Sequence, residues 1–202
     1  MKRLTIFALV ALVGIGLAVL PQATAGEPDF AAKHLEESRD ALVAATKGLS
    51  EAQWNFRESP ERWSAAEIAE HLAASEDFLF QLVTDKVMKT EKMAEPLPNA
   101  EETDKQLLAF LADRSQKFQA PEPLRPTNRF ETPQKAMEHF LASRARTLEF
   151  LKTTPDLRLY AMEGPGGQKR DAYQWLLFIS GHTVRHTKQL QQVKDDPNFP
   201  KN

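Results

Sequence analysis

The fold class of this chain follows from one segment, Asp171-Ala-Tyr-Gln-Trp-Leu-Leu-Phe-Ile-Ser-Gly-His-Thr-Val-Arg-His-Thr-Lys-Gln-Leu-Gln-Gln-Val-Lys194. Its apolar residues recur at three- and four-residue steps, which is the period of an amphipathic α-helix. The same stripe contains His182 and His186, so both imidazoles lie on the inward face of the predicted helix. Two such histidines can share a cation, although core histidines that only find hydrogen-bond partners are the more common case. A metal site needs further ligands from elsewhere in the chain.

A second helix supplies a third histidine. Ser64 with Glu67 has the pattern of a capping box, and Trp63 with Ile68 has that of a hydrophobic staple, so this helix is predicted to begin after Ser64 with Trp63 largely buried. His71 falls on its inward stripe. Glu67, one turn earlier, is either a fourth ligand or base or simply the capping residue, and capping is the simpler interpretation. His34 and His139 do not belong to such a group.

The remaining periodic segments predict an all-α fold. Helices are expected at Asp29–Lys47, Ala100–Phe118 and from Pro133 to about Pro155, in addition to the two above. Phe78, Phe118 and Leu141 are assigned to inward faces. No stretch alternates with the period of a strand, and the Gly-rich segment Leu157–Lys169 is interpreted as a loop. The predicted architecture is a four-helix bundle in which Ala100–Phe118 is an additional accessory helix.

The N-terminus has the organisation of a secretory signal peptide. A short basic start is followed by the uncharged apolar run Leu4–Leu20 and by the small residues Ala23-Thr24-Ala25. An uncleaved membrane anchor is the alternative, but 17 residues are short for a span of roughly 20. The predicted divisions are therefore a signal peptide at 1–25, a helical domain at 29–194 and a C-terminal tail at 195–202. Such a protein is expected to be periplasmic or secreted, with no stable membrane insertion after cleavage.

Charge and cysteine content restrict the chemistry. The formal net charge is −2, and removal of Lys2 and Arg3 with the signal peptide makes it −4. No basic stripe with interleaved aromatic residues is present, so nucleic acid is not an expected partner. The chain contains no cysteine, which excludes disulfides, thiolate ligands and a cysteine nucleophile. Any metal must therefore be bound by nitrogen and oxygen.

Two segments carry a resemblance to a known family. Trp63-Ser-Ala-Ala-Glu-Ile-Ala-Glu-His71-Leu-Ala-Ala-Ser-Glu76 and Gly181-His-Thr-Val-Arg-His-Thr-Lys-Gln-Leu190 resemble the DinB-like (YfiT-like) superfamily of helical-bundle metalloenzymes. The resemblance implies that His71, His182 and His186 bind a divalent metal, with water completing its coordination. Gln189 and Glu76 match frequent family positions without an assignable role. The accessory helix and the signal peptide depart from the compact cytoplasmic members.

The resemblance and the residues together leave two hypotheses for function. One is a metal-dependent hydrolase or transferase that acts on a small molecule of the cell envelope, with zinc or nickel as the metal best suited to imidazole ligands. The other is a non-catalytic bundle that binds a metal or a ligand. The sequence indicates no general base and does not identify the substrate, and a homodimer stays open as an oligomeric state. A solvent-accessible pocket at the histidines favours an enzyme, whereas a fourth protein ligand favours a structural site.

Overall fold

The structure is a computed structural model that describes residues 27–164 and 167–201, so the predicted signal peptide lies outside the described part. The described residues form six α-helices, three short 3-10 helices and one two-stranded sheet. In chain order, the elements are α1 (Glu27–Thr46), α2 (Glu51–Asn55), α3 (Ala65–Asp85), η1 (Val87–Lys89), α4 (Ala100–Ala112), η2 (Glu122–Leu124), α5 (Pro133–Thr153), η3 (Leu157–Leu159), β1 (Ala161–Glu163), β2 (Lys169–Asp171) and α6 (Ala172–Lys194).

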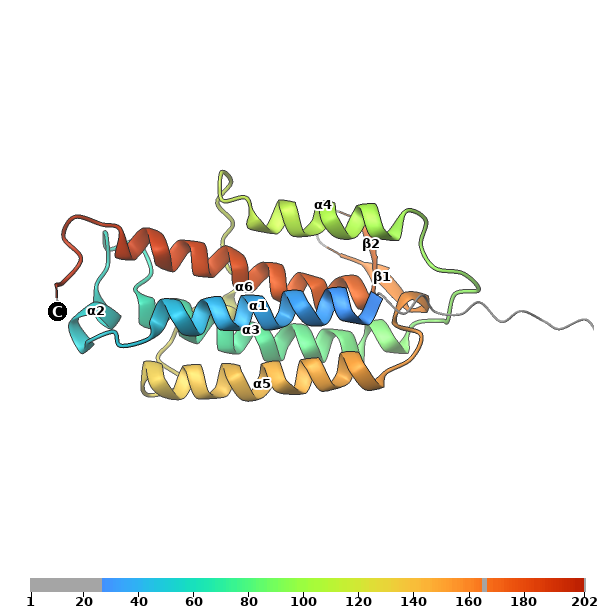
Figure 1. The fold of residues 1–202 in the computed structure, drawn as a ribbon, viewed down its shortest axis with the longest axis horizontal. Helices are drawn as coiled ribbons and strands as arrows, with labels where there is room; N and C mark the ends of the chain where they lie inside the picture. The colour runs from blue at the N-terminus through green and yellow to red at the C-terminus, as the bar shows by residue number, and fades with distance from the viewer. Residues whose placement is uncertain (1–26, 165–166, 202) are drawn as a thin grey trace, which may run out of the picture.

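Four long helices form the bundle, and α4 lies outside it. Helix α1 packs on α5 and α6, and α3 packs on the same two helices, so each helix has two neighbours. Figure 1 shows that α1 and α6 run in one direction while α3 and α5 run in the other. Since α3 and α5 are parallel, the chain must return along the whole bundle between them, and α4 makes this return against α6. This arrangement confirms the predicted all-α bundle with an accessory helix.

The helix starts follow from local chemistry. The hydroxyl of Ser64 accepts the amide of Glu67, and the carboxylate of Glu67 accepts the amide of Ser64, which completes the predicted capping box of α3. Asp171 and Gln174 make the same reciprocal pair at the start of α6. Thr132 caps α5, and Pro133 occupies its first turn. None of the described helices combines the length and the apolar character needed to cross a membrane.

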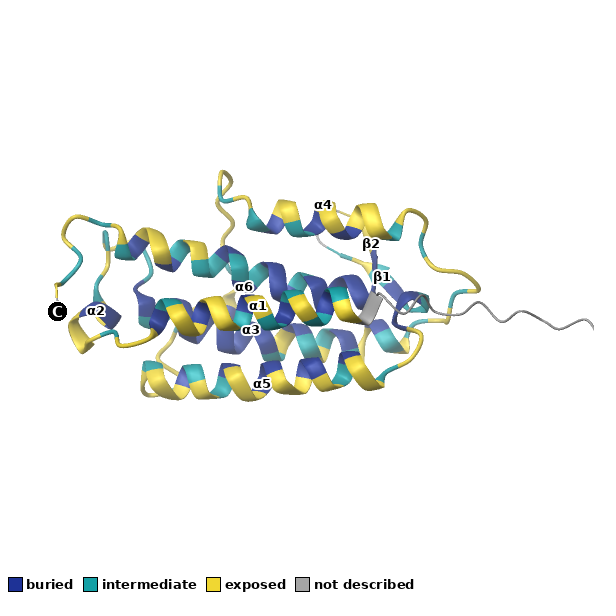
Figure 2. Ribbon diagram, in the orientation of Figure 1, coloured by how far each residue is buried: buried dark blue, intermediate teal, exposed yellow. Residues whose placement is uncertain are grey.

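A buried polar layer divides the bundle core into two apolar clusters. One cluster surrounds residues 172–179 of α6 and the other surrounds residues 190–193. Figure 2 shows that the buried residues lie on the faces that the bundle helices turn toward one another. Between the two clusters, every bundle helix contributes buried polar side chains. They are Ser38, Ser75, Glu76, Ser143, Arg144, Thr147, Ser180 and Thr183. The histidines of α6 belong to the same level of the bundle, so the predicted site lies where the core changes from apolar to polar.

Arg144 is the centre of this polar layer. Its Nε and Nη2 donate to the two carboxylate oxygens of Glu76 at 2.7 and 2.8 Å. Nη1 donates to the Leu35 carbonyl at 2.6 Å and to the Ser38 hydroxyl at 2.9 Å, and Nη2 also donates to the Thr183 hydroxyl at 2.8 Å. All five N–H groups of the guanidinium are thereby used, which is the condition for burying a charge at low cost. Glu76, which had no role in the sequence analysis, is the partner that makes Arg144 tolerable inside the core.

Two predicted features of the accessory helix are wrong. Helix α4 ends at Ala112 and not at Phe118, and the side chain of Phe118 is 59% exposed. The helix stops because Asp113 adopts an extended backbone conformation and its carboxylate accepts the amide and hydroxyl of Ser115. Asn99 precedes the helix with a φ of 55°, in the left-handed region, and its side chain makes no capping bond.

Buried charge also sets which face of α4 points inward. Asp104 is buried and Thr103 is exposed, because Asp104 forms an ion pair with Arg158, which also contacts Asp171 at the start of α6. This pairing connects the accessory helix to the bundle. A close approach at Gly181 adds to it, since a Cβ there would lie 2.7 Å from the side chain of Leu111.

Other expectations fail for short or edge segments. The Gly-rich loop contains an antiparallel hairpin in which Ala161, Met162 and Glu163 pair with Asp171, Arg170 and Lys169. Strands of three residues are too short for a period of two to be visible in the sequence. Phe78 and Leu141 were predicted to point inward but are 45% and 38% exposed, because they lie at the edge of the inward stripes of α3 and α5.

Candidate metal centre

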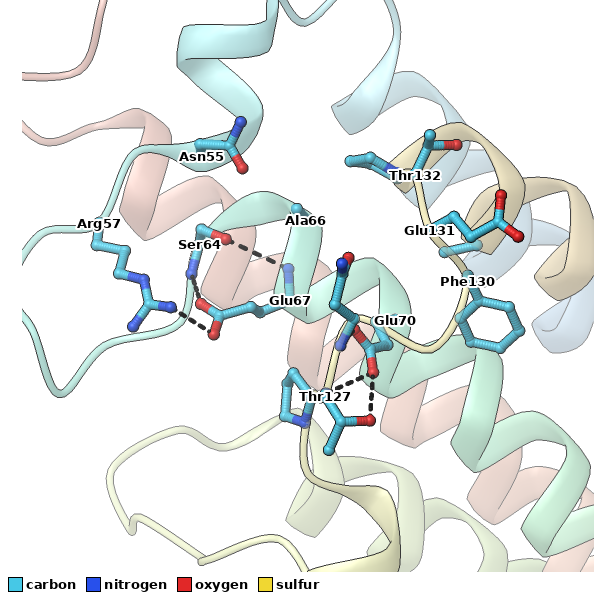
Figure 3. A pocket seen from close by; sticks show the side chains of 14 residues that line it. Asn55, Arg57, Ser64, Ala66, Glu67, Glu70, Thr127, Phe130, Glu131 and Thr132 are labelled. Carbon is cyan, nitrogen blue, oxygen red and sulfur yellow. Dashed lines mark hydrogen bonds and ion pairs between the residues drawn. The ribbon is translucent and has the colours of Figure 1, made fainter.

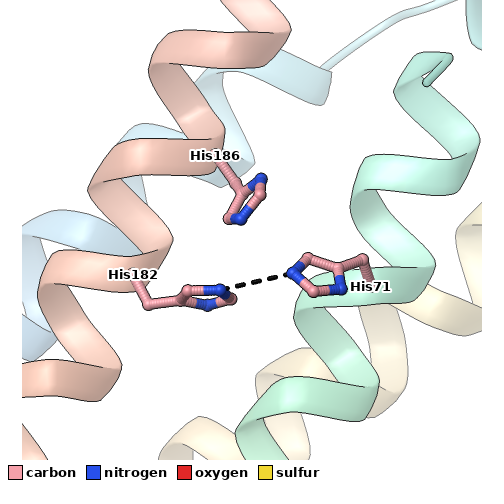
Figure 4. A group of neighbouring side chains, drawn as sticks. All are labelled: His71, His182 and His186. Atoms are coloured by element: carbon pink, nitrogen blue, oxygen red, sulfur yellow. Dashed lines mark hydrogen bonds between the residues drawn. The ribbon is translucent and has the colours of Figure 1, made fainter. Parts of the chain in front are cut away.

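Three histidines from two antiparallel helices meet between α3 and α6. His71 comes from α3, and His182 and His186 come from successive turns of α6 (Figure 4). One nitrogen from each ring lies within 4.8 Å of the others, and Nε2 of His71 is 3.3 Å from Nε2 of His182. His71 is buried at 2% exposure, while the two histidines of α6 are half-buried. The structure therefore brings together all three residues that the sequence singled out.

The tautomer of His71 follows from the hydrogen bond of its Nδ1 atom. Its Nδ1 lies 2.8 Å from the carbonyl oxygen of Leu124, in the segment between α4 and α5. A carbonyl oxygen can only accept, so Nδ1 carries the proton and donates. Nε2 of the neutral ring is then a lone-pair donor that faces the other two histidines.

The same reasoning fixes the tautomer of His186. Its Nδ1 lies 2.9 Å from Oε1 of Gln189, which also accepts from Nη1 of Arg114 at 3.4 Å. Arginine can only donate, so the shared atom of Gln189 is its oxygen and Nδ1 of His186 is protonated. Gln189, a family-typical position without a role in the sequence analysis, thus orients the ring of His186.

Burial keeps the three rings neutral. Desolvation lowers the pKa of His71 from its usual value, partly opposed by the Leu124 carbonyl. Desolvation and the nearby His71 lower the pKa of His182 to about 3, and desolvation with the two neighbouring histidines lowers the pKa of His186 well below its usual value. Neutral imidazole is the form that binds metals, so protons compete weakly at neutral pH.

Aromatic rings cover the cluster on two sides. The ring of Trp63 lies 4.8 Å from that of His71 and 6.1 Å from that of His186, measured between centroids. Phe178 stacks on His182 at 6.3 Å. Trp63 was predicted to be largely buried as part of a staple, but it is only partly buried because one side of its ring covers the histidines. No pattern in the sequence indicates this role.

Other candidate residues lie outside the cluster or have other partners. Glu67 accepts the amide of Ser64 and pairs with Arg57 at 2.7 Å, so its carboxylate is committed to capping. His139 pairs with Asp77 at 2.6 Å. His34 contacts Phe30 on α1. These positions agree with the interpretation that left them out of the site.

The donor set fits a divalent cation bound by nitrogen. Tetrahedral zinc with Zn–N bonds of about 2.0–2.1 Å places its ligand nitrogens about 3.3 Å apart, and the two facing Nε2 atoms of His71 and His182 are 3.3 Å apart. Among the described residues, the group that could hold a metal consists of the three histidines alone, without a carboxylate or a fourth histidine. Three protein ligands leave coordination positions open, as in catalytic sites.

Two cavities lie beside the histidines rather than over them. One of about 400 Å³ is lined by the N-terminal residues of α3 and α5, including Ser64, Glu67, Glu70 and Thr132 (Figure 3). The other, of about 270 Å³, includes Asp77, Leu124 and His139 in its lining. The three histidines line neither of these two cavities, and His182 and His186 are themselves partly exposed.

Comparison with known proteins identifies the family. The model of the DinB superfamily matches residues 34–190, which span α1 to α6. The chain belongs to the DinB superfamily. Among curated proteins, the uncharacterized protein YuaE of Bacillus subtilis (strain 168) is 27% identical over 152 residues, which cover 74% of this chain and 88% of YuaE.

A solved structure shares the fold of this DinB-superfamily protein. YfiT from Bacillus subtilis, described as a probable metal-dependent hydrolase with an unusual four-helix bundle topology, superimposes with a TM-score of 0.52. The match covers 87% of this chain and 90% of YfiT at 13% identity, so it supports the fold and no more. The three-histidine cluster is a candidate site for a divalent metal.

Proposed function

We propose that this protein is an exported metalloenzyme that binds one divalent cation through His71, His182 and His186 and hydrolyses a small molecule of the cell envelope. The observation that carries the proposal is the convergence of three neutral imidazoles without a fourth protein ligand among the described residues. The description of YfiT as a probable metal-dependent hydrolase supports the same reaction class. Transfer to an acceptor other than water is the closest variant of this chemistry.

Individual residues of the chain would contribute to this reaction in different ways. Leu124 and Gln189 hold the rings of His71 and His186 so that their Nε2 lone pairs face the site. Trp63 and Phe178 restrict water around the rings. A cation bound by three neutral ligands keeps its full charge, which is suited to lowering the pKa of water or polarising a carbonyl.

A non-catalytic metal- or ligand-binding bundle is the second candidate, and one observation favours it. The two cavities described above are not lined by the histidines. A protein that only uses a metal to stabilise its fold needs no route for a substrate.

Activity measurements separate the two candidates. The purified protein, loaded with zinc or nickel, is assayed against esters, amides, lactones and thiol acceptors, beside the metal-free protein and the His182→Ala variant. Turnover of any class that requires both metal and His182 supports the enzyme. A stably folded, metal-loaded protein without turnover across the panel supports the binding protein.

A further inference from the structure

The segment that supplies the Leu124 carbonyl to His71 is itself held by a residue next to His71. Glu70 lies on α3 with a side chain that is 8% exposed. Its Oε1 accepts the amides of Thr127 and Arg129 at 2.6 and 3.3 Å, and its Oε2 accepts the amide of Asn128 at 2.8 Å. Figure 3 shows Glu70 reaching from the helix to this turn. Three successive amides that converge on one carboxylate fix the backbone of the turn.

Arg129 extends this contact to the residues on either side of Leu124. Its Nε donates to Glu70 at 3.0 Å, its Nη1 to the Pro123 carbonyl at 3.0 Å, and its Nη2 to the Arg125 carbonyl at 2.6 Å. The planar guanidinium therefore joins Glu70 to the carbonyls of the residues before and after Leu124. The carbonyl between them is the one that accepts from Nδ1 of His71.

The turn has a backbone conformation that needs such support. Asn128 has a φ of 62°, in the left-handed region that disfavours residues other than glycine. Residues 127–129 are exposed and contribute little apolar packing, whereas the side chain of Leu124 is buried. Burial of this side chain holds Leu124 on the bundle, and Glu70 and Arg129 fix the backbone around it, on which the direction of its carbonyl depends.

We propose that Glu70 and Arg129 are positioning residues for the metal ligand His71, acting through the 123–129 turn to hold its ring in the Nδ1–H tautomer with Nε2 directed at the metal. The inference rests on the proposed metal site. Neither residue touches the metal in this arrangement. Because the two side chains act on one carbonyl, loss of either releases the same hydrogen bond.

The test compares Glu70→Gln and Arg129→Ala with wild type by two measurements. Long-range ¹H–¹⁵N NMR of the metal-free protein reports which nitrogen of His71 carries the proton, with the His71 signals assigned by their loss in His71→Asn. Calorimetric titration with Zn²⁺ reports metal affinity. We expect the Nδ1–H tautomer in wild type, a mixture of tautomers in both variants, and an affinity roughly ten- to a hundredfold lower, the usual effect of losing a partner of a metal-bound histidine.

Asp77→Asn is the matched control. Asp77 is also a carboxylate of α3 that gathers several donors, but these come from α5. Asp77→Asn should leave the His71 tautomer and the Zn²⁺ affinity unchanged. Equal changes in Asp77→Asn would overturn the proposal, because they would indicate general loosening of the bundle.

The use of two variants keeps the test decisive if one of them does not fold. Arg129 has a side chain that is 31% exposed, so Arg129→Ala decides the question if Glu70→Gln does not fold. An unaltered tautomer and affinity in folded Arg129→Ala would contradict the inference. If wild type binds no Zn²⁺, the proposed function fails, while the tautomer comparison in the metal-free protein still decides the positioning role.

Discussion

At the scale of single residues, His182 leads to a prediction about stability that needs no metal. The unfolded chain protonates this ring near its ordinary pKa of 6.5, whereas the folded protein protonates it only near pH 3. Between these values the unfolded state binds more protons, so the free energy of unfolding falls as the pH decreases. In the range from pH 7.5 to about 5, His182 should account for up to about 2 kcal/mol of that decrease.

Urea unfolding of the metal-free protein at both pH values measures this effect. His182→Asn removes the titrating ring, so its stability should decrease less between the two pH values than that of wild type. Burial raises the pKa of Asp171 to about 6, which gives the opposite dependence, but this contribution is the same in both proteins. An equal decrease in the two proteins would show that the ring is protonated at its ordinary pKa.

Arg144 and Glu76 give a second prediction at this scale. Arg144→Met leaves the carboxylate of Glu76 buried at 2% exposure without its cation, which should lower the free energy of unfolding by about 3–5 kcal/mol. The double variant Arg144→Met/Glu76→Met should recover much of this loss, since the hydroxyls of Ser38, Thr147 and Thr183 also bond to carbonyls of their own helices.

Chemical denaturation of the two variants tests this pair. If the double variant is as unstable as Arg144→Met, the ion pair stabilises the core by more than the cost of burying its two charges.

At the scale of the elements, the start of α3 can be tested independently of the metal. Ser64→Ala removes the hydroxyl that accepts the Glu67 amide and should cost about 1 kcal/mol of stability. Zinc affinity should not change, because Ser64 has no contact with the rings. Ser59→Ala removes an exposed hydroxyl outside a helix and is the control. Unchanged thermal stability in Ser64→Ala would show that the cap does not contribute.

The elements also show what sequence patterns can and cannot predict. The cap at Ser64 was predicted because its partner, Glu67, lies three residues further along the chain. His71, His182 and His186 were predicted to face the core, because helical spacing determines the direction in which each side chain points. The carbonyl of Leu124 left no such signal, since a backbone acceptor that lies 53 residues from His71 has no sequence pattern.

A long-range ion pair and a local turn explain the errors in the accessory helix. The ion pair between Asp104 and Arg158 determines which face of α4 points inward, and only the folded chain brings these two residues together. Phe118 was assigned to the helix by its apolar spacing, but Asp113 ends the helix first. Apolar periodicity thus predicted the four bundle helices well and the accessory segment poorly.

At the scale of the whole molecule, the long return between α3 and α5 connects the fold to the site. Because these helices are parallel, residues 86–132 must cross the bundle, and the crossing segment carries Arg114 and Leu124 to the histidines. The crossing segment thus supplies the acceptor of His71 directly, through Leu124, and supports the ring of His186 indirectly, through the contact of Arg114 with Gln189.

Export is a further prediction for the whole molecule. The basic start, the apolar run and Ala23-Thr24-Ala25 predict cleavage after Ala25. N-terminal sequencing of the protein recovered from the producing cells should begin at Gly26. A retained Met1 would contradict the cleavage and favour an anchor.

Metal content is the most direct test of the three-histidine site. Elemental analysis after zinc loading and desalting is made on wild type and on His71→Ala, His182→Ala and His186→Ala, with His34→Ala and His139→Ala as matched controls. Close to one equivalent is expected in wild type and in both controls, with a large loss in each of the three cluster variants. Wild type without zinc, or full zinc content in any cluster variant, would contradict the assignment.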